Sequence, residues 1–464
     1  MSEPCPTVRR AICFAVFASL PACTPMPRTV DASPILDASV TRTFDFTTPE
    51  EIDAAASQDA NVDATASIDA ATVDLALPTP DLPLPPDSAR VDFAIPDLAT
   101  PDLATPDLAH PDLLPPPDLT ACGTPQTAHL AVVGGVHQLY TASYTATGGW
   151  TSFVNNSSPA FEQPVLALTG SIASPFVVAR VADATLAAQR FDSCTRAYVT
   201  PSLIITGNTT ALRPAASGDV AGVDVVYRGA TNGDQLLYHT RWAGSSWSAA
   251  SQQASMLTAL PPATASTSGV LHALFTGTDT KVYDGVISDA AGGGGAVAIP
   301  GALSNVEPAV VVDSAGGLRA VFTGTDTILY SASRPAGGSW SAPVSLCNGV
   351  ASCSVLSNVA PVIALDATGA PLVAWLGTDG HLYTTSFTAG AWGSPLAVNA
   401  TETALFVPAI SAGVGTAQAE LVYARASDGL PRHARLVGGA WGSATTIASA
   451  TFAVTAQPAM VTIP

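Results

Sequence analysis

The residues of this sequence best suited to hold a ligand are aromatic, and they return at similar spacing through the second part of the chain. A flat aromatic ring can stack on the C–H face of a sugar while neighbouring polar groups fix its hydroxyls. Rings at one position of a repeated unit can equally pack as core, so both interpretations stay open. The tryptophans are Trp150, Trp242, Trp247, Trp340, Trp392 and Trp441, and the matching tyrosines are Tyr140, Tyr238, Tyr283, Tyr330 and Tyr383.

One unit, "YHTRWAGSSW" at residues 238–247, combines these rings with a cation. We expect Trp242 to be the exposed ring, because it stands beside Arg241 at the edge of a Gly-Ser turn. Trp247 occupies the repeated position, which favours burial. The candidate ligand-binding residues are therefore Tyr238, Arg241, Trp242 and Trp247, with the equivalent residues Tyr330, Trp340, Tyr383, Trp392 and Trp441.

Groups that could catalyse a reaction are scarce in the same region. From residue 122 onward Lys281 is the single lysine, and glutamates are few. No metal-binding helix motif, nucleophile elbow, phosphate loop or EF-hand loop is present. These observations argue against an enzyme and indicate neither a metal nor a cofactor. A formal net charge of -19, without a basic stripe interleaved with aromatics, also argues against nucleic acid as a partner.

A repeated phrase indicates which elements position the rings. "GTDTILYSASRPAGGSW" at 324–340 returns as "GTDGHLYTTSFTAGAWG" at 377–393. A proline followed by a short apolar run also recurs at steps of about 50 residues, and a period of about 40 to 50 residues is typical of β-propeller blades. These prolines are Pro164, Pro214, Pro262, Pro308, Pro361, Pro408 and Pro458.

Each unit reads as four short strands. In the clearest unit the strands are "PAVVVD", "LRAVFTG", "TILYSAS" and "SWSAPVSL", and turn-forming Gly, Asp and Pro lie between them. We interpret Asp279, Asp326, Asp379 and Asp428 as turn formers rather than ligands. The fold class predicted is all-β, a seven-bladed β-propeller of four-stranded blades.

The two ends of the repeated region predict that the ring closes on itself. Residues 129–153 supply the last three strands of a blade, whereas "PAMVTIP" at 458–464 supplies a first strand with nothing after it. Together they complete one blade and remove the exposed sheet edges of an open ring. We therefore predict a propeller domain over 122–464, closed by the C-terminal strand.

The preceding residues predict export and anchoring. Residues 1–22 carry two arginines, an apolar run and small residues, which is typical of a signal peptide. "LPAC" resembles a bacterial lipobox with Cys23 as the lipidated residue; a plain signal-peptidase cut is the alternative. The acidic, Pro-rich segment 23–121 predicts a disordered, extended spacer. We expect a protein lipid-anchored in the bacterial cell envelope, at the outer membrane, that contacts the membrane only through its lipid.

Four further cysteines fit an oxidising compartment, since their number is even. Cys347 and Cys353 are close enough in sequence for a small loop disulfide. That pairing would leave Cys122 to bond Cys194.

The phrases "GTDGHLYTTSFTAGAWGSP" and "NGDQLLYHTRWAGSSWS" resemble the repeat of bacterial seven-bladed propeller lectins of the fucose-binding, PLL-like kind. The resemblance implies that glycans bind in pockets between blades. Fungal fucose lectins of similar architecture use an Arg and a Glu in each site, and this chain does not repeat that pair. We expect a surface lipoprotein that displays a carbohydrate-binding propeller. A non-catalytic propeller that binds an envelope protein is the alternative, and a propeller glycosidase or lyase is the third.

Overall fold

The structure is a computed structural model that describes residues 126–156, 161–169, 174–181, 183–193, 195–199, 203–230, 233–290, 293–347, 355–447 and 449–463. The regular elements in these ranges are β-strands, which form seven antiparallel sheets. The predicted signal peptide (1–22), Cys23 and the predicted spacer (23–121) lie outside the described residues. Within the described ranges, no helix has the length and apolar character needed to cross a membrane.

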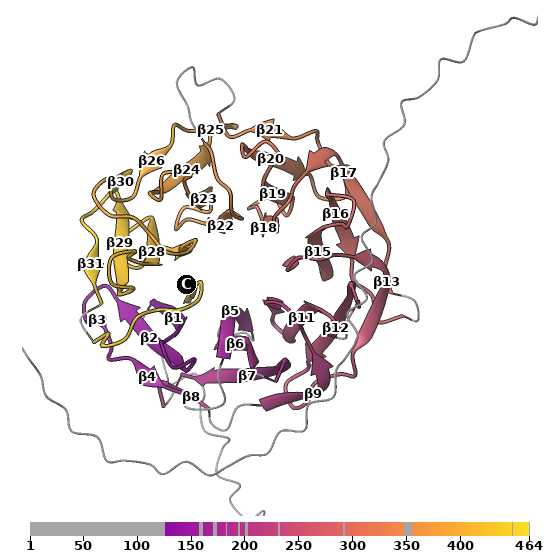
Figure 1. Cartoon of the computed structure of the whole chain (residues 1–464), viewed down its shortest axis with the longest axis horizontal. Helices are drawn as coiled ribbons and strands as arrows, with labels where there is room; N and C mark the ends of the chain where they lie inside the picture. Colours follow the sequence, from indigo (N-terminus) through magenta and orange to yellow (C-terminus); the bar gives the residue numbers. More distant parts are fainter. Residues whose placement is uncertain are drawn as a thin grey trace, which may run out of the picture. The chain divides into compact units, whose positions relative to one another are not determined.

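Seven sheets stand around a central opening as the blades of a propeller (Figure 1), which confirms the predicted fold. Blade 1 is built from β32 (Ala459–Ile463), β1 (Thr127–Val133), β2 (Leu139–Thr145), β3 (Gly149–Trp150) and β4 (Val154–Asn155). Blade 2 is built from β5 (Phe161–Thr169), β6 (Ser174–Val181), β7 (Thr185–Asp192), β8 (Ala197–Tyr198) and β9 (Leu203–Thr209). Blade 3 is built from β10 (Ala215–Asp219), β11 (Gly222–Arg228), β12 (Leu236–Trp242) and β13 (Ser251–Leu257).

The remaining blades repeat the same order. Blade 4 is built from β14 (Ala263–Thr267), β15 (Val270–Thr276), β16 (Lys281–Val286) and β17 (Ala296–Leu303). Blade 5 is built from β18 (Ala309–Val312), β19 (Leu318–Thr323), β20 (Leu329–Arg334) and β21 (Val344–Ser345). Blade 6 is built from β22 (Val362–Leu365), β23 (Pro371–Leu376), β24 (Leu382–Thr388), β25 (Ala391–Trp392) and β26 (Leu396–Ala397). Blade 7 is built from β27 (Ala409–Ala412), β28 (Ala419–Ala424), β29 (Pro431–Val437), β30 (Ala440–Trp441) and β31 (Thr445–Thr446).

Six of the recurring prolines directly precede the first strand of a blade, and Pro164 lies within β5, where the pairing with β6 shifts register. All seven line one cavity of about 210 Å³ at the centre of the ring. Proline has no amide donor, so it is tolerated at the start of a strand that has no partner on its inner edge. The sequence period therefore marks the point at which each blade begins.

Closure of the ring is confirmed. Strand β32 pairs antiparallel with β1, with Thr127 opposite Ile463 and Ala131 opposite Ala459. The Thr462 hydroxyl also contacts blade 7, lying 2.8 Å from the Ser411 hydroxyl oxygen and 2.6 Å from the Ala412 carbonyl oxygen. The closing strand thus completes blade 1 and joins it to blade 7.

The apolar core is divided among the interfaces between neighbouring blades. One cluster joins Leu274 and Ile299 of blade 4 to Phe322 of blade 5, and another joins Leu382 of blade 6 to Tyr423 of blade 7. The second strands contribute most, since every residue of β1 and β28 is buried. Both faces of a blade are therefore covered, one by the preceding blade and one by the next.

The repeated Gly-Thr-Asp phrase forms the turn between the second and third strands. In blade 6, Asp379 accepts a hydrogen bond from the His381 backbone N–H (3.0 Å) and another from the Tyr383 hydroxyl (2.6 Å). The left-handed residue is Gly380, with φ +81. A Cβ on Gly377 would lie 2.5 Å from the Asp379 carboxylate and 2.9 Å from the Tyr383 ring. The predicted turn role is confirmed, since Asp279, Asp326 and Asp428 accept backbone hydrogen bonds in the same way.

Cys347, just after β21, is disulfide-bonded. Every other cysteine, including Cys122, Cys194 and Cys353, lies outside the described residues. The proposed pairings therefore stay predictions.

Candidate functional site

The predicted tyrosines hold the turns of their own blades. The hydroxyls of Tyr238, Tyr330 and Tyr383 donate to Asp234, Asp326 and Asp379 at 2.9, 2.7 and 2.6 Å. Each ring also stacks on the aromatic residue opposite it in the second strand, as Tyr383 does on Trp375 at 5.7 Å. The hydrogen bond to Asp379 raises the pKa of Tyr383. These hydroxyls are engaged within the protein, so the tyrosines are accounted for by the fold.

The side chains predicted to form a pocket at residues 238–247 do not all share one face of the blade. Side chains alternate along β12, so Tyr238 and Trp242 pack toward blade 2 while Arg241 lies on the opposite face. Trp242 is 9% exposed and lies 5.9 Å from the Phe176 ring of blade 2. Trp247, which was expected to be buried, is half-buried beside it. The assignment of Trp242 as the exposed ring was therefore wrong, because the strand pairing turns it inward.

The recurring tryptophans lie over the preceding blade. Trp340 of blade 5 donates its indole N–H to Asp284 of blade 4 at 2.9 Å, and Trp441 of blade 7 donates to Thr384 of blade 6 at 2.7 Å. Trp340 and Trp392 are 8% and 7% exposed, whereas Trp441 is half-buried. These two interfaces thus combine polar groups of one blade with the indole ring of the next.

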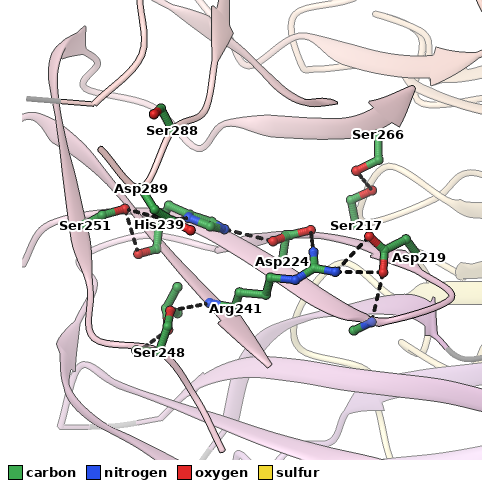
Figure 2. Close-up of polar contacts among 12 residues, drawn as sticks. Ser217, Asp219, Asp224, His239, Arg241, Ser248, Ser251, Ser266, Ser288 and Asp289 are labelled. Atoms are coloured by element: carbon green, nitrogen blue, oxygen red, sulfur yellow. Dashed lines mark hydrogen bonds and ion pairs between the residues drawn. The ribbon is translucent and has the colours of Figure 1, made fainter. Parts of the chain in front are cut away.

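Three interfaces contain an arginine and a histidine bound to a buried acid. In blade 3, Asp224 lies between His239 (2.9 Å) and Arg241, and Arg241 also reaches Asp219 at 2.8 Å (Figure 2). The other His239 ring nitrogen lies 2.7 Å from Asp289 of blade 4. The equivalent sets are Asp284, His272 and Arg334 between blades 4 and 5, and Glu420, His433 and Arg435 in blade 7.

In blade 7 this cluster borders an open groove between blades 7 and 1. The groove has a volume of about 650 Å³, and Trp441, Trp150, Tyr144 and Arg435 contribute to its walls. The Arg435 guanidinium lies 5.4 Å from the centre of the Tyr144 ring. The Trp150 indole N–H is buried and has no hydrogen-bond partner among the described residues. The groove therefore offers aromatic faces and a cation.

The Arg435 side chain is positioned by hydrogen bonds on both sides. Its Nε donates to Glu420 at 3.1 Å, and its Nη2 donates to the Val414 carbonyl oxygen at 2.5 Å. His433 contacts the same carboxylate at 2.8 Å. Glu420 is fully buried, so its charge is compensated by these two partners rather than by water.

A smaller cavity of about 160 Å³ lies on the other side of blade 1, against blade 2. His129 of β1 and Tyr198 of β8 contribute to its walls, and both His129 Nε2 and the Tyr198 hydroxyl are buried without a partner in the described part of the chain. Burial lowers the pKa of His129 to about 4, and burial raises the pKa of Tyr198. The imidazole is therefore neutral at neutral pH.

Of the candidate ligand-binding residues, Trp441 lines one of these two cavities, and Trp150, named with the recurring tryptophans, lines the same groove. Sequence reasoning missed Arg435, His433, Tyr144 and His129 as cavity-lining residues. A signal was present, because "HAR" at 433–435 stands in the same place as "HTR" at 239–241, each with an acid on the preceding strand. The acid is Asp in one unit and Glu in the other, which hides the repetition. No group of three potential metal ligands is arranged to hold an ion in the described ranges.

Several solved structures, lectins among them, are similar to this chain. The BP39L lectin from Burkholderia pseudomallei is 17% identical, with a TM-score of 0.60, covering 70% of this chain and 96% of that one. AofleA from Arthrobotrys oligospora is 12% identical (TM-score 0.43; 73% and 93% covered), and the fucose-specific lectin from Aleuria aurantia is 16% identical (TM-score 0.41; 58% and 90% covered). The first of these likenesses supports the propeller fold.

No protein-family model matches the sequence, and no curated protein matches it either.

Proposed function

We propose that this protein is a lectin, a non-catalytic propeller that binds carbohydrate in the groove between blades 7 and 1. The observation that carries the proposal is the combination of half-buried indole rings with a fixed guanidinium in one open groove. A sugar presents an apolar C–H face and a rim of hydroxyls, which match aromatic walls and charged hydrogen-bonding groups. The similarity in fold to a lectin supports the same proposal.

The groove can bind a sugar without reacting with it. Glu420 is enclosed by His433 and Arg435, so it is engaged in orienting the arginine. Trp441 keeps its indole N–H on Thr384 of blade 6, which fixes the ring at the edge of the groove. Stacking on such a ring contributes about 1 to 2 kcal/mol, so a single site binds weakly.

We further propose that the signal peptide and Cys23 direct export and lipidation. The protein would then be anchored in the bacterial cell envelope, with the propeller displayed beyond the segment 23–121. The support for this is the sequence pattern at residues 1–23. Mass spectrometry of the mature protein tests it: a lipidated N-terminal Cys23 is expected, and an unmodified start elsewhere contradicts it.

A glycan array with the purified protein tests carbohydrate binding, followed by competition with the free sugar. Ser443 is exposed in the groove, so Ser443→Tyr fills the groove with little effect on stability and should abolish binding. Ser394 follows Trp392 as Ser443 follows Trp441, and it is also exposed, so Ser394→Tyr is the matched control. Binding to envelope proteins alone, with no sugar competing, would instead support a protein-binding propeller.

A further inference from the structure

The interface between blades 5 and 6 contains four polar groups whose hydrogen-bonding atoms are buried and unpaired among the described residues, and three of them lie where the preceding interface has a carboxylate and its donors. These three are Arg319 of β19, Ser331 of β20 and Trp392 of β25, and the fourth is the Trp375 indole N–H of β23. The Arg319 Nε, the Ser331 hydroxyl and the Trp392 indole N–H have no partner among the described residues. Ser331 is 1% exposed and Trp392 is 7% exposed. Leaving such groups unpaired costs free energy, so these three groups call for an explanation.

These groups lie on surfaces that face each other. Val321 is opposite Ser331 in the pairing of β19 with β20, so Arg319, two residues before Val321, shares a face with Ser331. The Arg319 guanidinium lies 3.6 Å from the centre of the Phe387 ring and 5.8 Å from that of Trp392, both in blade 6. The cation is therefore held between the two blades by aromatic contact.

The preceding interface shows what such a set of donors binds. Between blades 4 and 5, Asp284 accepts a hydrogen bond from the Trp340 indole N–H at 2.9 Å and contacts His272 at 2.8 Å and Arg334. Ser331 of blade 5 holds the position that Asp284 holds in blade 4, since each directly follows the tyrosine of the repeated phrase. In the same way, Trp392 of blade 6 corresponds to Trp340 of blade 5. The serine therefore replaces the carboxylate while the indole and a cation are retained.

We propose that the interface between blades 5 and 6 binds a carboxylate supplied by a ligand, either a small organic acid or an acidic sugar. The carboxylate would accept from Arg319, Trp392 and Ser331, as Asp284 accepts within the protein at the neighbouring interface. All three groups can donate, and a guanidinium with two neutral donors suits an anion better than a neutral ligand. This site is separate from the groove between blades 7 and 1, and its chemistry differs from that of the proposed sugar site.

Titration with acetate, glucuronate and methyl glucoside tests the proposal, with binding followed by calorimetry and by tryptophan fluorescence. Acetate and glucuronate should both bind if any small carboxylate is accepted, and glucuronate alone if the ligand is an acidic sugar; methyl glucoside should not bind here. Arg319→Gln should weaken binding by roughly tenfold or more, because a charge-assisted hydrogen bond is lost. The groove variant Ser443→Tyr should leave this binding unchanged, which separates the two sites.

Ser331→Asp is the most informative variant, because it places a carboxylate where Asp284 stands in the preceding blade. It should abolish carboxylate binding and raise the melting temperature. Ser339→Asp, an exposed serine in the same blade, is the matched control and should do neither. The proposal is overturned if no carboxylate binds the wild-type protein, or if Ser331→Asp binds acetate as the wild type does.

Discussion

Burial of His129 links stability to pH. Its ring is 1% exposed, and burial lowers its pKa from the ordinary 6.5 to about 4. Between these pH values the unfolded chain binds more protons at this residue than the folded chain does. The free energy of unfolding should therefore fall as the pH drops from about 6.5 toward 4, by up to about 3 kcal/mol from this residue.

Urea unfolding of the wild type and of His129→Asn across this range measures the contribution. The variant should show a flatter dependence between pH 6.5 and 4. Asn keeps a group that can hydrogen-bond Ser143, which His129 contacts at 3.1 Å, so the comparison isolates the titration. Parallel curves for the two proteins would rule out His129 as the source.

A second prediction at the residue scale concerns the turn glycine. Gly377→Ala should destabilise the protein by about 1 to 3 kcal/mol, because the new Cβ would overlap Asp379 and Tyr383. A Cβ on Gly393 of the same blade would meet only ordinary contacts, at 3.6 and 3.8 Å, so Gly393→Ala is the control. Thermal melting distinguishes them, and equal melting temperatures would show that the turn adapts.

At the scale of elements, removal of β32 tests closure. A chain lacking residues 459–463 leaves the backbone groups of β1 unpaired on its inner edge and loses the Thr462 contact to blade 7. Such an edge is a template for aggregation, so the truncated protein should be less soluble or melt much earlier. Thr462→Val removes only the side-chain contact and should cost about 1 kcal/mol. Unchanged melting after truncation would contradict a structural role for β32.

The elements were predictable because each is specified locally. The Gly-Thr-Asp turn, the tyrosine four residues after its aspartate and the proline before or within the first strand all lie within one unit, so strand order could be read from them. The site was not predictable in the same way. Tyr144 and Arg435 meet across a blade interface, and Trp242 departs from Arg241 because adjacent residues of β12 face different blades. The pairing register of the strands decides which side chains of a strand point toward the preceding blade and which toward the next. The sequence does not specify that register.

At the scale of the whole molecule, the blades share a fold but not a surface chemistry. Asp284 is bound by the side chains of Trp340 and Arg334. His239 contacts the carboxylates of Asp224 and Asp289, so the polar groups of these interfaces are paired within the protein. The two cavities that flank blade 1 retain unpaired polar groups.

Sugar binding should therefore have a low stoichiometry. Calorimetry with a saturating monosaccharide is expected to give one site per chain, the groove between blades 7 and 1, in contrast to one site at every interface. A value near seven would mean that the filled interfaces open for the ligand. Repeating the measurement with Ser443→Tyr should remove this site and leave no sugar binding.

The pairing of β32 with β1 also affects how the protein is made. Strand β1 is synthesised long before β32. Blade 1 therefore lacks its first strand until all the other blades have been synthesised. Only a chain translated through β32 can shut the ring. A product terminated before β32 would leave the ring open and present the unpaired edge of β1, which favours aggregation. We therefore expect complete folding only of chains translated through β32.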